Sequence, residues 1–105
     1  MRWSVADSLR EAGFTVIEAA SGHEATAICR SDVPLHLLFT DINLFGSNTG
    51  LDVADYFRTH RPDIPVLYTS GKEIDAARRV HGSEFLPKPY QLENAVSACR
   101  RLCTK

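Results

Sequence analysis

Three side chains capable of chemistry stand at the ends of short apolar runs in the sequence. They are a carboxylate at Asp41, a hydroxyl at Ser70 and an ammonium group at Lys88. Runs of this length, rich in large apolar residues, are typical of strands buried on both faces of a parallel sheet. Because parallel strands deliver their carboxyl ends to one edge, we expect the three groups in one crevice. The set suits transfer of a phosphoryl group to a carboxylate, with Asp41 as nucleophile, Ser70 bonding a phosphoryl oxygen and Lys88 neutralising charge.

Each of these residues also has an ordinary structural interpretation. An aspartate after a strand more often closes an Asx-turn or caps a helix. The pair Ser70-Gly71 is a common junction between a strand and a loop, and a loop lysine is usually solvated. Lys88, however, lies between Pro87 and Pro89, and both prolines restrict the backbone around it. The lysine is therefore expected on a stiff loop, with Lys88–Pro89 as a candidate cis peptide bond.

The elements that must position these residues alternate along the chain. Apolar periodicity, caps and turn residues predict the helices and strands. The predicted helices cover 2–12, 22–31, 50–60, 72–80 and 92–103, and the predicted strands cover 15–19, 35–41, 65–71 and 84–86. Such alternation implies a parallel sheet with helices on both faces, joined by right-handed crossovers. We therefore expect one doubly wound α/β domain over residues 1–105, in three layers (α/β/α) with four strands.

Composition narrows the classes of function. A chain of 105 residues can build one core, and its 44% hydrophobic and 24% charged residues are ordinary for a soluble domain. A net charge of −1 shows no excess of basic residues of the kind that binds nucleic acid. No apolar run is long enough to span a bilayer, and no signal peptide is recognisable. We expect a cytoplasmic protein without direct contacts to nucleic acid or membrane.

The chain has three cysteines, Cys29, Cys99 and Cys103, without metal-type spacing. Their odd number and the helical spacing of the last two favour buried thiols that act as small hydrophobes, in a reducing compartment.

Several stretches together carry a resemblance to a known family. The chain resembles a response-regulator receiver domain, the CheY-like module of two-component signalling, over nearly its whole length. The resemblance implies the flavodoxin-like, CheY-like version of the doubly wound fold, and a phosphorelay signalling role rather than an enzyme. The matching stretches are 38–43, 65–71 and 85–90, with 11–14, 19–22 and 50–52 also typical.

The resemblance assigns roles to residues at the predicted site. It implies that Asp41 accepts a phosphoryl group from the phosphohistidine of a sensor histidine kinase or phosphotransfer protein, with Mg²⁺ assisting. Asn43 would give the metal its backbone carbonyl, beside the Asp41 carboxylate. Asn43 and Lys72 would occupy positions that tune dephosphorylation.

The resemblance also implies a switch that reads the modification. Ser70 would be the switch hydroxyl and Phe85 the switch aromatic residue. The face formed by the fourth helix, the last strand and the last helix, roughly 72–103, would bind a downstream protein partner.

One departure from the family concerns both fold and metal site. Receivers of this family begin with a strand that ends in two adjacent acidic residues, whereas this sequence begins inside the first helix, where Asp7 does not replace the pair. The gap would lie between 15–19 and 35–41. We expect direct pairing of these two segments or a homodimer that covers the gap. With Asp41 and Asn43 alone, Mg²⁺ binding should be weak.

Two milder departures follow the acceptor and affect the switch. Phe45 stands where the family commonly has proline, which should loosen the loop, and Phe85 lacks the hydroxyl of the usual tyrosine.

Two alternatives to a phosphorylatable receiver remain at this point. One is a non-phosphorylatable receiver-like interaction module, because the acidic pair is missing. The other is a small phosphohydrolase, since Asp41-Ile42-Asn43 faintly resembles an Asp-x-Asp nucleophile motif. The second carboxylate that such an enzyme needs as general acid is Asn43 here, and the chain leaves no room for a cap domain.

Overall fold

The computed structural model describes residues 4–43 and 49–104. The start of the predicted first helix and Phe45 lie outside the described residues. Ser4 caps the first helix, because its hydroxyl accepts the Asp7 N–H while the Asp7 carboxylate accepts the Ser4 N–H. The elements are α1 (Val5–Glu11), α2 (Gly22–Arg30), β1 (Leu38–Asp41), α3 (Gly50–His60), β2 (Val66–Ser70), the 3₁₀ turn η1 (Ala76–Arg78), β3 (Glu84–Pro87) and α4 (Leu92–Cys103).

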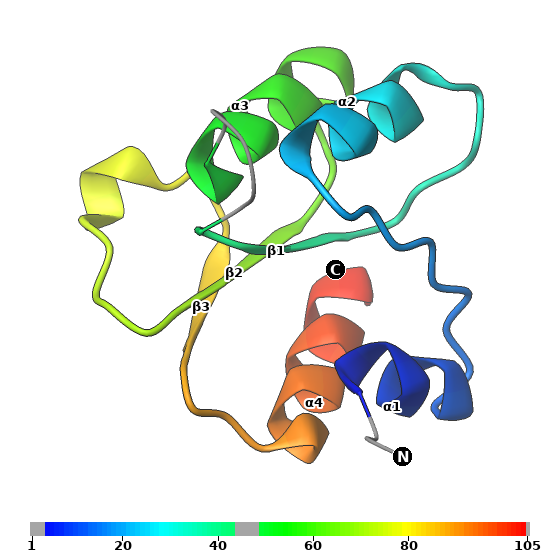
Figure 1. Ribbon diagram of the computed structural model, residues 1–105, viewed down its shortest axis with the longest axis vertical. Helices are drawn as coiled ribbons and strands as arrows, with labels where there is room; N and C mark the ends of the chain where they lie inside the picture. The colour runs from blue at the N-terminus through cyan, green and yellow to red at the C-terminus, as the bar shows by residue number, and fades with distance from the viewer. Residues whose placement is uncertain (1–3, 44–48, 105) are drawn as a thin grey trace.

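The three strands form a parallel sheet in the order β1-β2-β3. Figure 1 shows α2 and α3 on one face of this sheet and α1 and α4 on the other. Each face has its own apolar cluster. Phe57 and Tyr68 belong to the cluster under α2 and α3, and Leu67 and Leu102 belong to the cluster beside α1 and α4. The predicted α/β fold with helices on both faces of a parallel sheet is thus confirmed.

The prediction of four strands is wrong for the described residues. Residues 15–19 form no ladder with a described strand, and Ile17 keeps 47% of its surface exposed. This segment instead joins α1 on one face of the sheet to α2 on the other (Figure 1). Its β-branched residues favour a strand, but β-propensity is expressed only when a neighbouring strand supplies the hydrogen bonds. The expected direct pairing of 15–19 with 35–41 is therefore absent.

The prediction of a helix over 72–80 is also wrong. The segment contains only the short turn η1, in which the Asp75 side chain accepts the Ala77 N–H at 3.0 Å. Farther along, the Val80 N–H bonds the buried Tyr68 hydroxyl at 3.1 Å instead of a helical carbonyl. Only four residues of the segment are apolar, two of them alanines, so little burial opposes these competing bonds.

The cysteines follow the sequence expectation in part. Cys29 and Cys99 are buried, and burial raises the pKa of the Cys99 thiol to about 12. Cys103 is exposed, contrary to expectation, although the preceding residue of the same turn of α4, Leu102, is buried. None of the helices in the described residues is long and apolar enough to cross a membrane.

Candidate functional site

The strand register brings the three predicted site residues to one edge of the sheet. Asp41 of β1 pairs with Thr69 of β2, and Ser70, the next residue, pairs with Pro87 of β3. The backbone N–H of Lys88 then donates to the carbonyl of Ser70 at 2.9 Å. The Lys88–Pro89 peptide bond is cis, as the sequence suggested. The carboxylate, hydroxyl and ammonium therefore lie at the carboxyl ends of three adjacent strands, as predicted.

Asp41 uses both oxygens of its carboxylate. Its Oδ2 is ion-paired with the ammonium of Lys88, and its Oδ1 accepts the backbone N–H of Asn43 at 3.0 Å. The side chains of Asp41 and Lys88 remain 30% and 43% exposed, so the pair faces solvent. The bond to Asn43 is the Asx-turn that an aspartate after a strand commonly makes. Asp41 thus closes an Asx-turn through one oxygen and pairs with Lys88 through the other, so both interpretations of this residue hold.

Ser70 lies beside this pair but its hydroxyl is engaged elsewhere. Ser70 is buried, and its Oγ accepts the backbone N–H of Lys72 at 3.1 Å. Phe85 is half-buried on β3, with the guanidinium of Arg79 5.7 Å from its ring centroid. Lys72 itself is exposed at the start of the following loop. The roles of Ser70, Phe85 and Lys72 as switch or tuning residues stay predictions.

Gly50 is a site residue that the sequence reasoning did not single out for its packing. Its N–H donates to the carbonyl of Ile42 at 2.8 Å, which closes the loop that follows Asp41. A Cβ on Gly50 would overlap the Asp41 carbonyl group and lie 2.9 Å from the Cα of Ile42. Only glycine therefore lets the first turn of α3 lie directly against the end of β1. No local pattern reveals this contact, because it joins two elements.

Tyr90 is a second neighbour whose part was not foreseen. Its ring centroid lies 6.2 Å from that of Phe39 on β1, next to the loop that carries Lys88. Burial raises the pKa of the Tyr90 hydroxyl, while the nearby Lys88 lowers it and Asp41 raises it. Tyr90 thus lies close enough to the ion pair to sense both charges, and it remains a neutral phenol at physiological pH.

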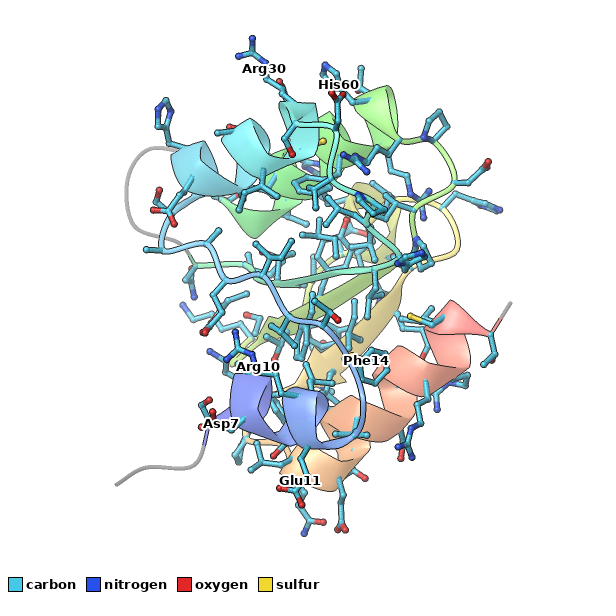
Figure 2. All side chains as sticks on the ribbon, turned by 90° about the vertical axis from the view of Figure 1, so that its right-hand side faces the viewer. Asp7, Arg10, Glu11, Phe14, Arg30 and His60 are labelled. Carbon is cyan, nitrogen blue, oxygen red and sulfur yellow. The ribbon has the colours of Figure 1, made fainter. Side chains whose placement is uncertain are left out.

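The residues present do not fit a complete Mg²⁺ site. Magnesium in proteins is held through carboxylates and retains several waters. Among the described residues no group of three or more His, Cys, Asp or Glu side chains gathers in one place. Residues 1–3, 44–48 and 105 contain none of these four residue types. Asp7, at the first turn of α1 in Figure 2, is bonded to Ser4, and Asp41 belongs to no such group.

Comparison with known proteins places the chain among signalling modules. The family described as the response regulator receiver domain matches residues 1–100. The DNA-binding transcriptional regulator NtrC of Salmonella typhimurium is 30% identical over 105 residues, covering 96% of this chain and 22% of its own length. The response regulator MprA of Mycobacterium ulcerans is 32% identical over 107 residues, covering 97% of this chain and 45% of its own length. The chain therefore spans less than half the length of these curated relatives.

Solved structures give the same result for the fold. A response regulator receiver protein from Sinorhizobium medicae superposes with a TM-score of 0.89 at 28% identity, covering 95% of this chain and 82% of that one. The receiver domain of the hybrid histidine kinase CckA gives 0.80 at 29% identity, covering 94% and 85%.

Proposed function

The chain belongs to the response-regulator receiver family, and on this premise we propose that Asp41 is its phosphoryl acceptor. The chain is a receiver domain of a two-component response regulator, a signalling module rather than an enzyme. The proposed donor is the phosphohistidine of a sensor histidine kinase or phosphotransfer protein. The observation that carries the proposal is the ion pair between Asp41 and Lys88 at the carboxyl ends of the strands.

The chemistry of transfer follows from this pair. A carboxylate oxygen of Asp41 attacks phosphorus, the P–N bond to the donor histidine breaks, and the imidazole leaves with the bonding electrons and takes a proton. The ammonium of Lys88, already beside Oδ2, then lies next to the new phosphoryl oxygens and stabilises their charge. The product is an aspartyl phosphate, which adds about one unit of negative charge at the sheet edge.

Magnesium is typical of the family, but among the described residues Asp41 belongs to no group of three or more His, Cys, Asp or Glu side chains that could hold it. We propose that Mg²⁺ binds weakly here and that Lys88 supplies most of the charge stabilisation. The transfer proposed above needs no group beyond those of the chain and the donor.

The modified site is proposed to signal through Ser70 and Phe85. For Ser70 to bond a phosphoryl oxygen, its hydroxyl must exchange the bond from the Lys72 N–H for a new one. Residues 72–103, which include η1, β3 and α4, would then present a changed face to a downstream protein.

The outer edge of β1 supports the proposal of a homodimer. The N–H groups of Leu38 and Ile42 bond β2, so those of Phe39 and Asp41 point to the other edge, where the described residues provide no strand. A second copy that covers this edge would satisfy these groups.

The second candidate is an interaction module that is not phosphorylated, which the lone carboxylate of Asp41 favours. The two are separated by intact mass after incubation with phosphoramidate, a small donor with a P–N bond. We expect a gain of one phosphoryl group that is absent in Asp41→Asn. A wild-type chain that gains no mass, yet gives the same circular dichroism as before treatment, would leave the interaction module as the function.

A further inference from the structure

The segment from Gly71 to Ser83, here called the η1 segment, joins β2 to β3 outside the layers of the fold. Most of its residues are exposed, and its one regular element is η1. It nevertheless contacts both α3 and the sheet through a few defined bonds. These contacts decide how firmly the segment is held.

On the side of α3, one arginine makes the contact. The Nη1 of Arg78 donates to Asp55 at 2.9 Å, and its Nη2 donates to Asp52 at 3.4 Å. Asp52 and Asp55 lie three residues apart, so they face the same side of α3. All three side chains remain about half exposed, at 46%, 49% and 51%. Ion pairs this exposed are weak and screened by salt, so they open and close at little cost.

On the side of the sheet, the contacts are of a different kind. The fully buried Tyr68 accepts the Val80 N–H, and the buried Ser70 accepts the Lys72 N–H, both at 3.1 Å. Tyr68 lies in the apolar cluster between the sheet and α3, so its bond is shielded from water. The η1 segment is therefore fixed at Lys72 and Val80 and held by charge between them, at Arg78.

We propose that Arg78, with Asp52 and Asp55, is a releasable latch that holds the middle of the η1 segment against α3. The latch gives the segment two arrangements, one closed on α3 and one open between the fixed ends at Lys72 and Val80. Opening also frees Arg79, the neighbour of Arg78, to leave the ring of Phe85.

The place of the latch links it to the site. Helix α3 begins with Gly50 packed against the carbonyl of Asp41, and the η1 segment begins one residue after Ser70. A change at Asp41 therefore reaches the η1 segment from α3 and from β2. The coupling of the latch to phosphorylation rests on the proposed function, whereas the latch itself does not.

Amide hydrogen exchange of the full chain tests the latch in the unmodified protein. Arg78→Gln is compared with Arg10→Gln, whose arginine is equally exposed and pairs with Glu18 in a different part of the molecule. We expect peptides from the η1 segment to exchange about two- to fivefold faster in Arg78→Gln and unchanged in Arg10→Gln. Asp55→Asn should reproduce the Arg78→Gln result.

Salt gives an independent readout on the same peptides. In roughly 0.5 M NaCl, which weakens solvent-exposed ion pairs such as those of Arg78, exchange of the η1 segment should rise in the wild type and stay constant in Arg78→Gln. Equal exchange in the wild type and Arg78→Gln would overturn the latch. So would acceleration that extends through β2 and α4, because the arginine would then support the whole fold.

A final arm separates the two proposals. After phosphoramidate treatment, we expect a chain that has gained one phosphoryl group to show faster exchange in the η1 segment, with no further gain in Arg78→Gln. If the chain gains no mass but Arg78→Gln still accelerates the segment, the proposed function fails and the latch stands. If the chain gains mass and the exchange of the segment is unchanged in every variant, the latch fails alone.

Discussion

The central strand of the sheet and its outer strand β1 differ in how well they are supported. In β2 every residue is buried, because β1 and β3 flank it and helices cover both faces. In β1 only Thr40 is buried, although the same helices are present. The segment Thr15–Ala19, richer in β-branched residues than Glu84–Pro87, forms no ladder, whereas Glu84–Pro87 does. The presence of a partner strand, more than β-propensity, decides which segment becomes a strand.

The candidate site joins the two outer strands. Asp41 comes from β1, and its partner Lys88 comes from the loop after β3, at the opposite edge of the sheet. The fully buried strand β2 lies between them. Among the described residues, Asp41 belongs to no group of three or more His, Cys, Asp or Glu side chains.

The largest expected effect tests the packing contrast directly. Leu67 of β2 is fully buried, whereas Ile17 is 47% exposed. Leu67→Ala should lower the free energy of unfolding by about 3–4 kcal/mol, because it leaves a cavity between the sheet and α4. Ile17→Ala should lower it by less than about 0.5 kcal/mol. Urea denaturation followed by circular dichroism measures both free energies. Equal losses of stability in the two variants would contradict the difference in packing between β2 and the segment at 15–19.

Removing the charge of Lys88, which comes from the opposite edge of the sheet, should slow phosphoryl uptake. Lys88→Met is expected to lower the initial rate with phosphoramidate about 100-fold, since the developing phosphoryl charge loses its cation. Arg30→Met serves as the control, because Arg30 is exposed in the last turn of α2 and has no contact with Asp41 among the described interactions. A rate for Lys88→Met within a factor of two of the control would show that Lys88 is not needed.

Gly50 tests the close approach of α3 to β1. Gly50→Ala should lower the free energy of unfolding by about 2 kcal/mol, because the new Cβ would overlap the backbone of Asp41. In Gly71→Ala the new Cβ meets nothing within 4 Å, so this variant should stay within about 0.5 kcal/mol of the wild type. If the two variants have the same urea midpoint, the close contact between Gly50 and Asp41 is contradicted.

The smallest expected effect concerns pH and the start of α1. Backbone and side-chain bonds from Ser4 lower the pKa of Asp7 below its ordinary value of 3.8. The cap therefore stabilises the fold above about pH 4 and is lost as pH falls through the lower, folded pKa. Asp7→Asn should show a smaller drop in urea midpoint between pH 7 and pH 2.5 than the wild type. An identical drop would mean that the cap does not contribute.

Much of this site could be predicted from the sequence, because its signals are local. Asp41, Ser70 and Lys88 each follow an apolar run, and parallel strands bring such ends together without further information. The helices with strong caps, α2 and α3, were likewise predicted near their observed bounds.

The features that the sequence did not predict correctly depend on contacts between distant parts of the chain. The strand at 15–19 needed a partner that its own residues do not specify. The helix predicted at 72–80 does not form, because Val80 bonds Tyr68 of β2 and Arg78 bonds Asp55 of α3. Both bonds join different elements. The packing of Gly50 on Asp41 is of the same kind, since neither residue indicates the other in sequence.

We propose that Asp41, paired with Lys88 and outside any cluster of metal-ligating side chains among the described residues, accepts the phosphoryl group. The rate of phosphoryl uptake during a titration with Mg²⁺ tests this proposal. With phosphoramidate as donor and intact mass as readout, we predict that saturating Mg²⁺ changes the initial rate by less than about threefold. A saturable increase of more than about 100-fold would contradict the claim, because it would require metal ligands beyond Asp41 and Asn43.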